Sequence, residues 1–455
     1  MASTPDELPT TAATFPSHQK PIPYSFKNGQ RTPLSSILPP LVFGTATFNH
    51  QYNDDPFAMD TTGLVTSALT HGIRAFDTSP YYGPSEELLG NALATPFVRE
   101  IFPRNSYMIL TKVGRIAGSE FDYSKEWVRQ SVRRSLERLH TDYLDLVYCH
   151  DVEFVSPAEV LEAVRELRRI RDEEGTIRYI GISGYPLDVL GDMAELILRE
   201  TGEPLNAVQS YANFTLQNQT LAGPRGIQRL RNAGVDVVPN ASILGMGLLR
   251  RQGVPCGALG DWHPAPSALR AAVRNASDFC DGYGERLEVI AIRFALETWI
   301  EAGAFCGSKG DPASGVPWKH ESNDDVGGTK LGVSVIGVSR APELEKTMLV
   351  WRSILDGLEG GEETAVQAGR WYRAWEWSRN RRQAVQILAE GIQEILRDGF
   401  DFAWASPDPG YVNQRKKQTV VQDSDAPWLT PAASPQAKPV KSGVEVVEEK
   451  SLPLR

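Results

Sequence analysis

The sequence predicts an α/β fold, a closed (β/α)8 TIM barrel with a C-terminal helical extension and a disordered tail. Eight short apolar segments, each typical of a buried strand, alternate with amphipathic helical segments between residues 41 and 358. This alternation is the pattern of βαβ units in a parallel sheet, and eight units are enough to close a barrel. A doubly wound open sheet is the alternative, but no GxGxxG motif follows the first strand.

The strand–helix pairs follow one another with short connections. Turn residues separate them, such as Gly175 after the fourth helix and Gly234 after the sixth. Strands are expected at residues 41–48, 75–79, 108–114, 143–150, 177–183, 207–213, 236–243 and 334–339. Helices are expected at residues 60–71, 84–94, 124–140, 157–174, 186–199, 218–232, 285–302 and 341–358, with a long Gly/Pro-containing loop before residue 285.

The barrel is expected to span residues 39–360. Residues 1–38, which are rich in Pro, Ser and Thr, predict an irregular lead-in. Residues 303–330 predict a flexible insertion, and residues 361–404, with many Trp and Arg between 371 and 396, predict a helical extension. Residues 405–455 are rich in Pro, Ser, Lys and Glu, which predicts a disordered tail.

Composition narrows the class of protein and its compartment. The formal net charge is -10 and basic residues are not clustered, which argues against nucleic-acid binding. The four cysteines are scattered, without a CxxC pair or metal-ligand spacing, so we expect neither disulfides nor a metal site. No apolar run is long enough to span a membrane, and the N-terminus lacks the apolar core of a signal peptide. We therefore expect a cytoplasmic protein with no membrane partner.

Polar residues follow three successive predicted strands at the point where each strand ends. Asp77 and Tyr82 follow the second strand, Lys112 ends the third and His150 ends the fourth. In a parallel barrel these four side chains converge at one mouth, where active sites lie. A phenol has a pKa near ~10, and a neighbouring ammonium favours its ionised form. The four residues therefore predict an acid/base site, although each alone also fits a loop aromatic, a helix cap, a strand end or a core histidine.

The same segments resemble the aldo-keto reductase superfamily. The resemblance rests on FDTSPYYG at 76–83, LTK at 110–112, VRQSVRRSLERL at 128–139 and DYLDLVYCH at 142–150. It covers residues 39–358. The long loop and MGLL at 246–249 are most similar to the D-arabinose 1-dehydrogenase and L-galactose dehydrogenase branch of that superfamily.

The resemblance implies an NAD(P)-dependent oxidoreductase of carbohydrate metabolism. The implied reaction is oxidation of an aldose at C1 to a lactone, by hydride transfer to the nicotinamide. Tyr82 would be the general acid/base, with Asp77 and Lys112 supporting it and His150 orienting the substrate oxygen. Two alternatives stay open: an NADPH-dependent aldehyde or ketone reductase, and a non-catalytic nicotinamide-binding regulatory subunit.

Cofactor contacts are carried over by position from the same resemblance. Ser183 and Gln209, which also fit a turn residue and a buried polar group, match the pair that binds the carboxamide. Ala241 stands where many relatives have a stacking tyrosine. Glu343 near the adenosine ribose favours NAD over NADP, and Arg340 opposes that reading. The implied cofactor contacts are Gly44, Thr45, Asp77, Ser183, Gln209, Ser242, Leu244, Gly245, Gly337, Ser339, Arg340 and Glu343.

Overall fold

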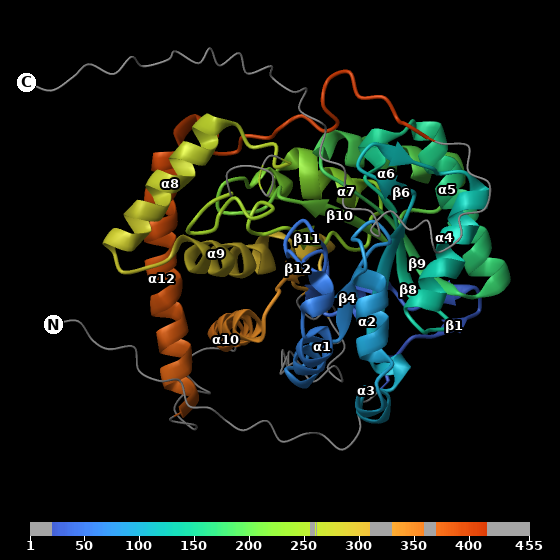
Figure 1. The fold of residues 1–455 in the computed structure, drawn as a ribbon, viewed down its shortest axis with the longest axis horizontal. Helices are drawn as coiled ribbons and strands as arrows, with labels where there is room; N and C mark the ends of the chain where they lie inside the picture. Colours follow the sequence, from blue (N-terminus) through green and yellow to red (C-terminus); the bar gives the residue numbers. More distant parts are fainter. Residues whose placement is uncertain (1–20, 255–259, 261, 310–329, 359–369, 416–455) are drawn as a thin grey trace, which may run out of the picture.

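The computed structural model describes residues 21–254, 260, 262–309, 330–358 and 370–415 of the chain. Eight parallel strands form a closed barrel, which confirms the predicted fold and excludes the open sheet (Figure 1). Around the barrel the strands run in the order β10 (Ala207–Tyr211), β11 (Asn240–Ala241), β12 (Ser334–Gly337), β3 (Leu41–Gly44), β4 (Ala75–Asp77), β5 (Met108–Val113), β8 (Leu144–His150) and β9 (Ile177–Gly184).

Helices follow the strands and cover the outside of the barrel. Some of them begin at a side-chain cap: the Ser124 side chain accepts from Trp127 N–H at the start of α4, and Ser156 and Glu159 form a capping box at α5. These helices are α1 (Thr61–Thr70), α2 (Ser85–Leu93), α3 (Pro96–Ile101), α4 (Lys125–Arg138), α5 (Pro157–Arg169), α6 (Leu187–Thr201), α7 (Arg229–Asn232), α9 (Leu287–Ala302) and α10 (Ala341–Leu358).

Single turns complete the pattern. The predicted fourth helix is α5 followed by a π-helical turn, and Gly175 ends it in the left-handed region at a φ of 70°. The short turns are η2 (Pro56–Ala58), η3 (Arg104–Ser106), η4 (Val152–Phe154), η5 (Ile170–Glu174), η6 (Thr220–Ala222), η7 (Pro224–Gln228), η8 (Ala304–Cys306) and η10 (Arg397–Gly399).

The amino-terminal end of the barrel is closed by the segment before β3. A small hairpin of β1 (Phe26–Lys27) and β2 (Gln30–Arg31) leads into the turn η1 (Leu34–Ser36). Leu34, Ile37 and Leu38 are fully buried and share a hydrophobic cluster with barrel residues such as Val42 and Tyr148. Burying these side chains excludes water from this end of the barrel.

The sixth and seventh strand–helix units are more irregular than predicted. The expected strand 236–243 is reduced to β11, with one isolated bridge between Val237 and Ala207. The expected helix 218–232 is wrong for its first part, because η6, η7 and the short α7 replace it. Gly226 explains part of this: its non-helical φ and ψ break the segment, and a Cβ there would lie 2.1 Å from the Leu221 carbonyl oxygen.

A helix that the sequence analysis missed lies within the predicted long loop. This helix, α8 (Ser267–Gly282), has an apolar side that includes Leu269, Val273 and Cys280. It packs against the C-terminal helix α12 (Arg370–Leu396), which crosses α8, α9 and α10 on one side of the barrel (Figure 1). The predicted loop before residue 285 is therefore wrong over α8.

A buried polar cluster fastens α12 to the barrel helices. Arg293 on α9 is 2% exposed and forms an ion pair with Glu297 at 3.1 Å. Its guanidinium also donates to the Ser378 hydroxyl on α12 at 3.0 Å and to the Ser353 hydroxyl on α10 at 3.0 Å. A buried guanidinium needs all of these partners, so the cluster fixes the position of α12.

Among the described residues no helix is long and apolar enough to cross a membrane.

Residues 397–415, which we call the strap, leave the end of α12 and run back across the molecule towards α5 (Figure 1). The side chain of Asn413 donates to the Phe121 carbonyl at 3.0 Å and accepts from Phe121 N–H at 2.9 Å. Disorder was predicted from residue 405 onward, and for residues 405–415 that prediction is wrong. Residues 416–455 lie outside the described residues, as do residues 310–329 of the predicted insertion.

Candidate active site

Strand register brings several predicted site residues to the carboxyl end of the barrel. Gly337 on β12 pairs with Gly44 on β3, and Gly44 pairs with Asp77 on β4. On the opposite side, His150 on β8 pairs with Ser183 on β9, and Ser183 pairs with Gln209 on β10. These pairs lie at or near the strand ends, so residues up to 293 positions apart in the sequence surround one mouth.

Asp77 and Lys112 form a buried ion pair at this mouth. The Lys112 ammonium donates to Asp77 Oδ1 at 2.7 Å and to the Thr78 carbonyl at 2.9 Å, and both side chains are at most 3% exposed. Burial raises the pKa of Asp77, while Lys112 and a hydrogen bond from Gln209 oppose that rise. The attraction and the hydrogen bonds offset part of the cost of burying two charges.

Tyr82 lies directly beside this pair. A turn presents it, in which Tyr82 N–H donates to the Ser79 carbonyl at 3.0 Å and Gly83 adopts a positive φ of 58°. The Lys112 ammonium is 4.8 Å from the centroid of the Tyr82 ring. Burial, then Asp77 and Asp151, raise the pKa of Tyr82 well above its usual value. The expected ionised phenol is therefore not favoured in the free protein, because burial outweighs the neighbouring cations.

His150 completes the group of four. Its ring lies 5.6 Å from that of Tyr82, at an interplanar angle of 90°. His150 Nδ1 is 3.0 Å from the Ser79 hydroxyl, and Nε2 is 3.6 Å from Asp151 Oδ2. Burial lowers the pKa of His150 well below its usual value, and Lys112 and Arg115 lower it further. The imidazole is therefore neutral at pH 7 and offers one donor and one acceptor.

A charged pair next to His150 was missed by the sequence analysis. Arg115, on the hairpin of β6 (Arg115–Ala117) and β7 (Glu120–Phe121), forms an ion pair with Asp151. Its guanidinium carbon lies 3.8 Å from the centroid of the Tyr81 ring, and a guanidinium N–H donates to the Tyr81 hydroxyl at 3.1 Å. Asp151 follows His150 directly in the sequence, which was the available signal. Arg115 gave none, because its partner is 36 residues away.

The residues expected to hold the nicotinamide have different surroundings. Gln209 Oε1 is buried and has no hydrogen-bond partner among the described residues. A buried acceptor of this kind fits an amide N–H from a ligand such as a carboxamide. Ser183 donates weakly to the Cys149 carbonyl at 3.5 Å. Thr45 instead turns inward: its hydroxyl contacts the Asp77 carbonyl at 3.1 Å and the Ser85 hydroxyl at 2.6 Å. Its N–H donates to the Asp77 carbonyl and its carbonyl accepts from Phe48 N–H, both at 2.8 Å, so its polar groups are all bonded within the protein.

The segment after β11 forms a tight turn. Gly245 N–H donates to the Ser242 carbonyl at 2.7 Å, and Ser242, Gly245 and Met246 all have positive φ values between 55° and 58°. Leu244 packs with the cluster around α8. Ala241 ends the strand here, and a methyl group offers no aromatic face for stacking.

The segment between β12 and α10 offers exposed groups at a helix N-terminus. Gly337, Arg340 and Glu343 are exposed. The Glu343 carboxylate accepts from Ser339 N–H at 2.9 Å, which neutralises one of the free donors at the start of α10. A phosphate at this N–H would have to displace a carboxylate of the same charge. The contact of Glu343 with the adenosine ribose stays a prediction.

The strap packs over loops that follow the barrel strands. Trp404 stacks on Tyr185, after β9, with ring centroids 4.7 Å apart and planes at 4°. Tyr411 contacts Phe154, after β8, at 5.0 Å, and Ser406 donates to Glu153 at 3.1 Å.

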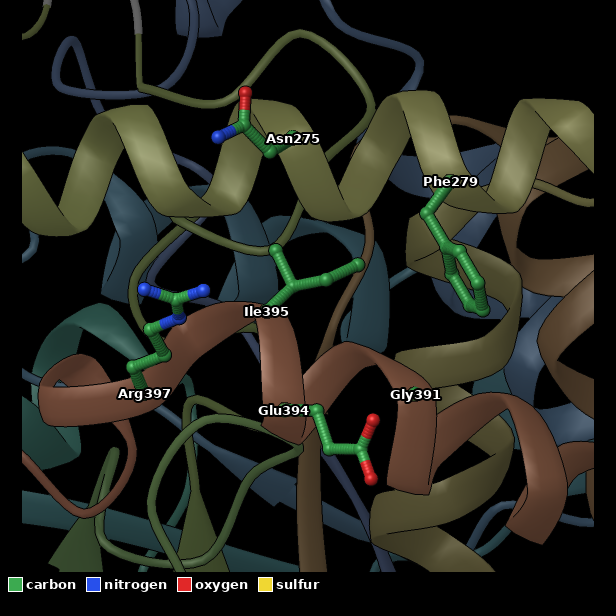
Figure 2. Close-up of a pocket in the computed structure, with 6 residues that line it drawn as sticks. All are labelled: Asn275, Phe279, Gly391, Glu394, Ile395 and Arg397. Carbon is green, nitrogen blue, oxygen red and sulfur yellow. The ribbon is translucent and has the colours of Figure 1, made fainter.

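A separate groove between α8 and α12 shares no residue with this site (Figure 2) and is lined by Asn275, Phe279, Gly391, Glu394, Ile395 and Arg397.

Comparison with known proteins identifies the family. The chain matches the Aldo/keto reductase family over residues 40–356, and it belongs to that family. It is therefore an oxidoreductase, and enzymes of this family use nicotinamide cofactors.

Three curated relatives are sugar dehydrogenases. A D-arabinose 1-dehydrogenase of Saccharomyces cerevisiae is 47% identical over 272 residues, covering 59% of this chain and 78% of the yeast protein. An L-galactose dehydrogenase of Arabidopsis thaliana is 37% identical, over 52% of this chain and 70% of the Arabidopsis protein. A D-threo-aldose 1-dehydrogenase of a Pseudomonas species is 25% identical, over 59% of this chain and 85% of the Pseudomonas protein.

Proposed function

We propose that this protein oxidises an aldose at C1 to a lactone, using a nicotinamide dinucleotide, with Tyr82 as the general acid/base. The observation that carries the proposal is the convergence of Tyr82, the buried Lys112–Asp77 pair and His150 at one barrel mouth. The similarity to three sugar dehydrogenases, two of them named as 1-dehydrogenases, supports an aldose as the substrate.

The bound nicotinamide supplies the hydride acceptor for oxidation, or the donor for reduction. His150 donates a hydrogen bond to the C1 oxygen of the sugar and so orients the C1–H bond. Tyr82 takes the proton from that oxygen as the C1–H bond breaks, and the C1–O bond becomes the lactone carbonyl. Lys112, held by Asp77, stabilises the phenolate that accepts the proton.

The raised pKa of Tyr82 predicts how the two directions respond to pH. A phenol that keeps its proton at neutral pH is ready to protonate a carbonyl oxygen, but it must ionise before it accepts a proton. We therefore expect kcat for sugar oxidation to rise with pH and kcat for carbonyl reduction to fall. Both trends follow from the ionisation of Tyr82 and need no ionisation of the sugar hydroxyl.

NAD is the proposed dinucleotide. The Glu343 carboxylate lies at the N-terminus of α10 and accepts a hydrogen bond from Ser339 N–H, so it would attract a ribose hydroxyl and repel a 2′-phosphate. The Glu343→Gln variant should lose part of its preference for NAD, whereas Glu345→Gln, one exposed acid further along the same helix, should keep it. An unchanged preference in Glu343→Gln would remove the basis for NAD.

The test is absorbance of the reduced nicotinamide with D-arabinose, L-galactose or L-fucose, supplying NAD and NADP separately. A signal with NAD and an aldose supports the proposal. No signal with any sugar, together with oxidation of NADPH on a simple aldehyde, would establish the alternative of an aldehyde or ketone reductase. The Tyr82→Phe variant should lose at least about 100-fold in kcat while its affinity for the dinucleotide stays within about twofold. Dinucleotide binding without turnover in the unsubstituted protein would instead indicate a regulatory subunit.

A further inference from the structure

Ser79 has no part in the reaction as proposed, yet its side chain is fixed against His150. The Ser79 hydroxyl is fully buried and lies 3.0 Å from His150 Nδ1. It also accepts a hydrogen bond from Tyr81 N–H at 3.1 Å. The turn that carries Tyr82 is held separately, by Tyr82 N–H donating to the Ser79 backbone carbonyl.

The donors and acceptors around Ser79 decide which ring nitrogen of His150 carries the proton. A serine hydroxyl has one hydrogen to donate and two lone pairs to accept with. Since Tyr81 N–H already donates to Ser79, the only other contact of the hydroxyl among the described residues is Nδ1. If Nδ1 carried the hydrogen, the buried Ser79 O–H would have no acceptor, which is costly. The hydroxyl is therefore the donor and Nδ1 the acceptor.

The surroundings of the other ring nitrogen favour the same arrangement. His150 Nε2 lies 3.6 Å from Asp151 Oδ2, and an N–H is attracted by a carboxylate whereas a lone pair is repelled. The charged and titratable groups that face the ring are Lys112 on β5, Arg115 on β6, Asp151 after β8, and Tyr81 and Tyr82 after β4. Both cations disfavour a second proton on the ring.

We propose that Ser79 is a positioning residue that holds neutral His150 in the tautomer with hydrogen on Nε2. His150 Nε2 is then the donor that faces the reacting oxygen of the substrate. This assignment deepens the proposed function and rests on it only for its kinetic consequences. The tautomer itself does not depend on what the substrate is.

The first test is long-range proton–nitrogen NMR on the full chain labelled at histidine nitrogens. The signal of His150, one of seven histidines, is identified by its absence in a His150→Gln variant. We expect a protonated Nε2 and an unprotonated Nδ1 at pH 7. The opposite tautomer, or an equal mixture, in the unsubstituted protein would overturn the proposal. This measurement uses no substrate, so its result stands apart from any failure of the proposed function.

The second test compares Ser79→Ala with Ser79→Thr and with Ser277→Ala. The alanine variant should populate both tautomers and lose at least about tenfold in kcat, with the KM for the dinucleotide unchanged. Its loss of activity at acid pH should begin at a higher pH, because the lost Ser79 donor had favoured the neutral ring. Ser79→Thr keeps a hydroxyl and should restore the tautomer.

Ser277→Ala is the matched control. Ser277 is buried on α8 and donates to the Arg251 carbonyl at 3.0 Å, so Ser277→Ala removes a buried serine bond far from this chemistry and should leave kcat unchanged. If Ser79 had a purely structural role, Ser79→Ala would be less stable, but the tautomer of His150 and the pH at which activity is lost on the acid side would not change. That outcome would refute the assignment.

Discussion

Removing the charge of Asp77 should destabilise the protein far more than removing a similar charge at the surface. In Asp77→Asn the Lys112 ammonium keeps the Thr78 carbonyl and a neutral amide oxygen as acceptors, but it loses its counter-charge. Lys112 is 1% exposed, so water does not replace the missing charge. The free energy of unfolding should therefore fall by about 3–5 kcal/mol, the usual cost of breaking a buried ion pair from one side.

The Glu301–Arg382 pair provides the matched control. It is similarly close, with two hydrogen bonds of 2.7 and 3.0 Å, but its side chains are 55% and 34% exposed. Water and salt screen such a pair, so Glu301→Gln should cost at most about 1 kcal/mol. Each variant removes one paired carboxylate charge, and the two sites differ strongly in burial, which is the variable under test.

Urea denaturation followed by circular dichroism gives both free energies. The transition midpoint should move to clearly lower urea concentration in Asp77→Asn and only slightly in Glu301→Gln. The dependence of the free energy of unfolding on urea concentration should be similar in both variants. The double variant Asp77→Asn/Lys112→Met removes the uncompensated charge and should recover part of the loss. If the two single variants cost the same, or if the double variant is less stable than Asp77→Asn, the account of a buried and compensated pair is refuted.

Two further predictions concern the strap and the loop after β8, which it contacts. Trp404→Ala removes a ring that is 9% exposed and stacked on Tyr185, so it should lower the free energy of unfolding by about 3 kcal/mol, whereas Trp377→Ala, at 48% exposed, should stay within about 1 kcal/mol in the same urea titration. Burial beside Asp151 raises the pKa of Glu153 to about 8, so its contribution to stability is complete below about pH 4 and is lost as the pH rises through 8. The Tm of the unsubstituted protein should therefore fall between pH 5 and pH 8. In Glu153→Gln this fall should be smaller, and an equal fall in both would exclude Glu153 as its cause.

The amino-acid sequence by itself determined the barrel and the placement of the four central side chains. Alternation of apolar strands and amphipathic helices is a local property, and some helix ends are set by nearby residues such as Ser156 and Gly175. Because parallel strands end at one edge, the order Asp77, Tyr82, Lys112, His150 along the chain was enough to predict that they meet. No distant contact had to be known.

Only the tertiary structure decided how these groups are charged and what covers them. Burial raises the pKa of Tyr82 against the effect expected from Lys112, and burial depends on packing from the whole barrel. The Arg115–Asp151 pair and the contact of Ser79 with His150 join segments 36 and 71 residues apart. Helix α8 and the strap are stable because each buries its apolar side chains on elements distant in sequence, namely α12 for the first and the loops after β8 and β9 for the second.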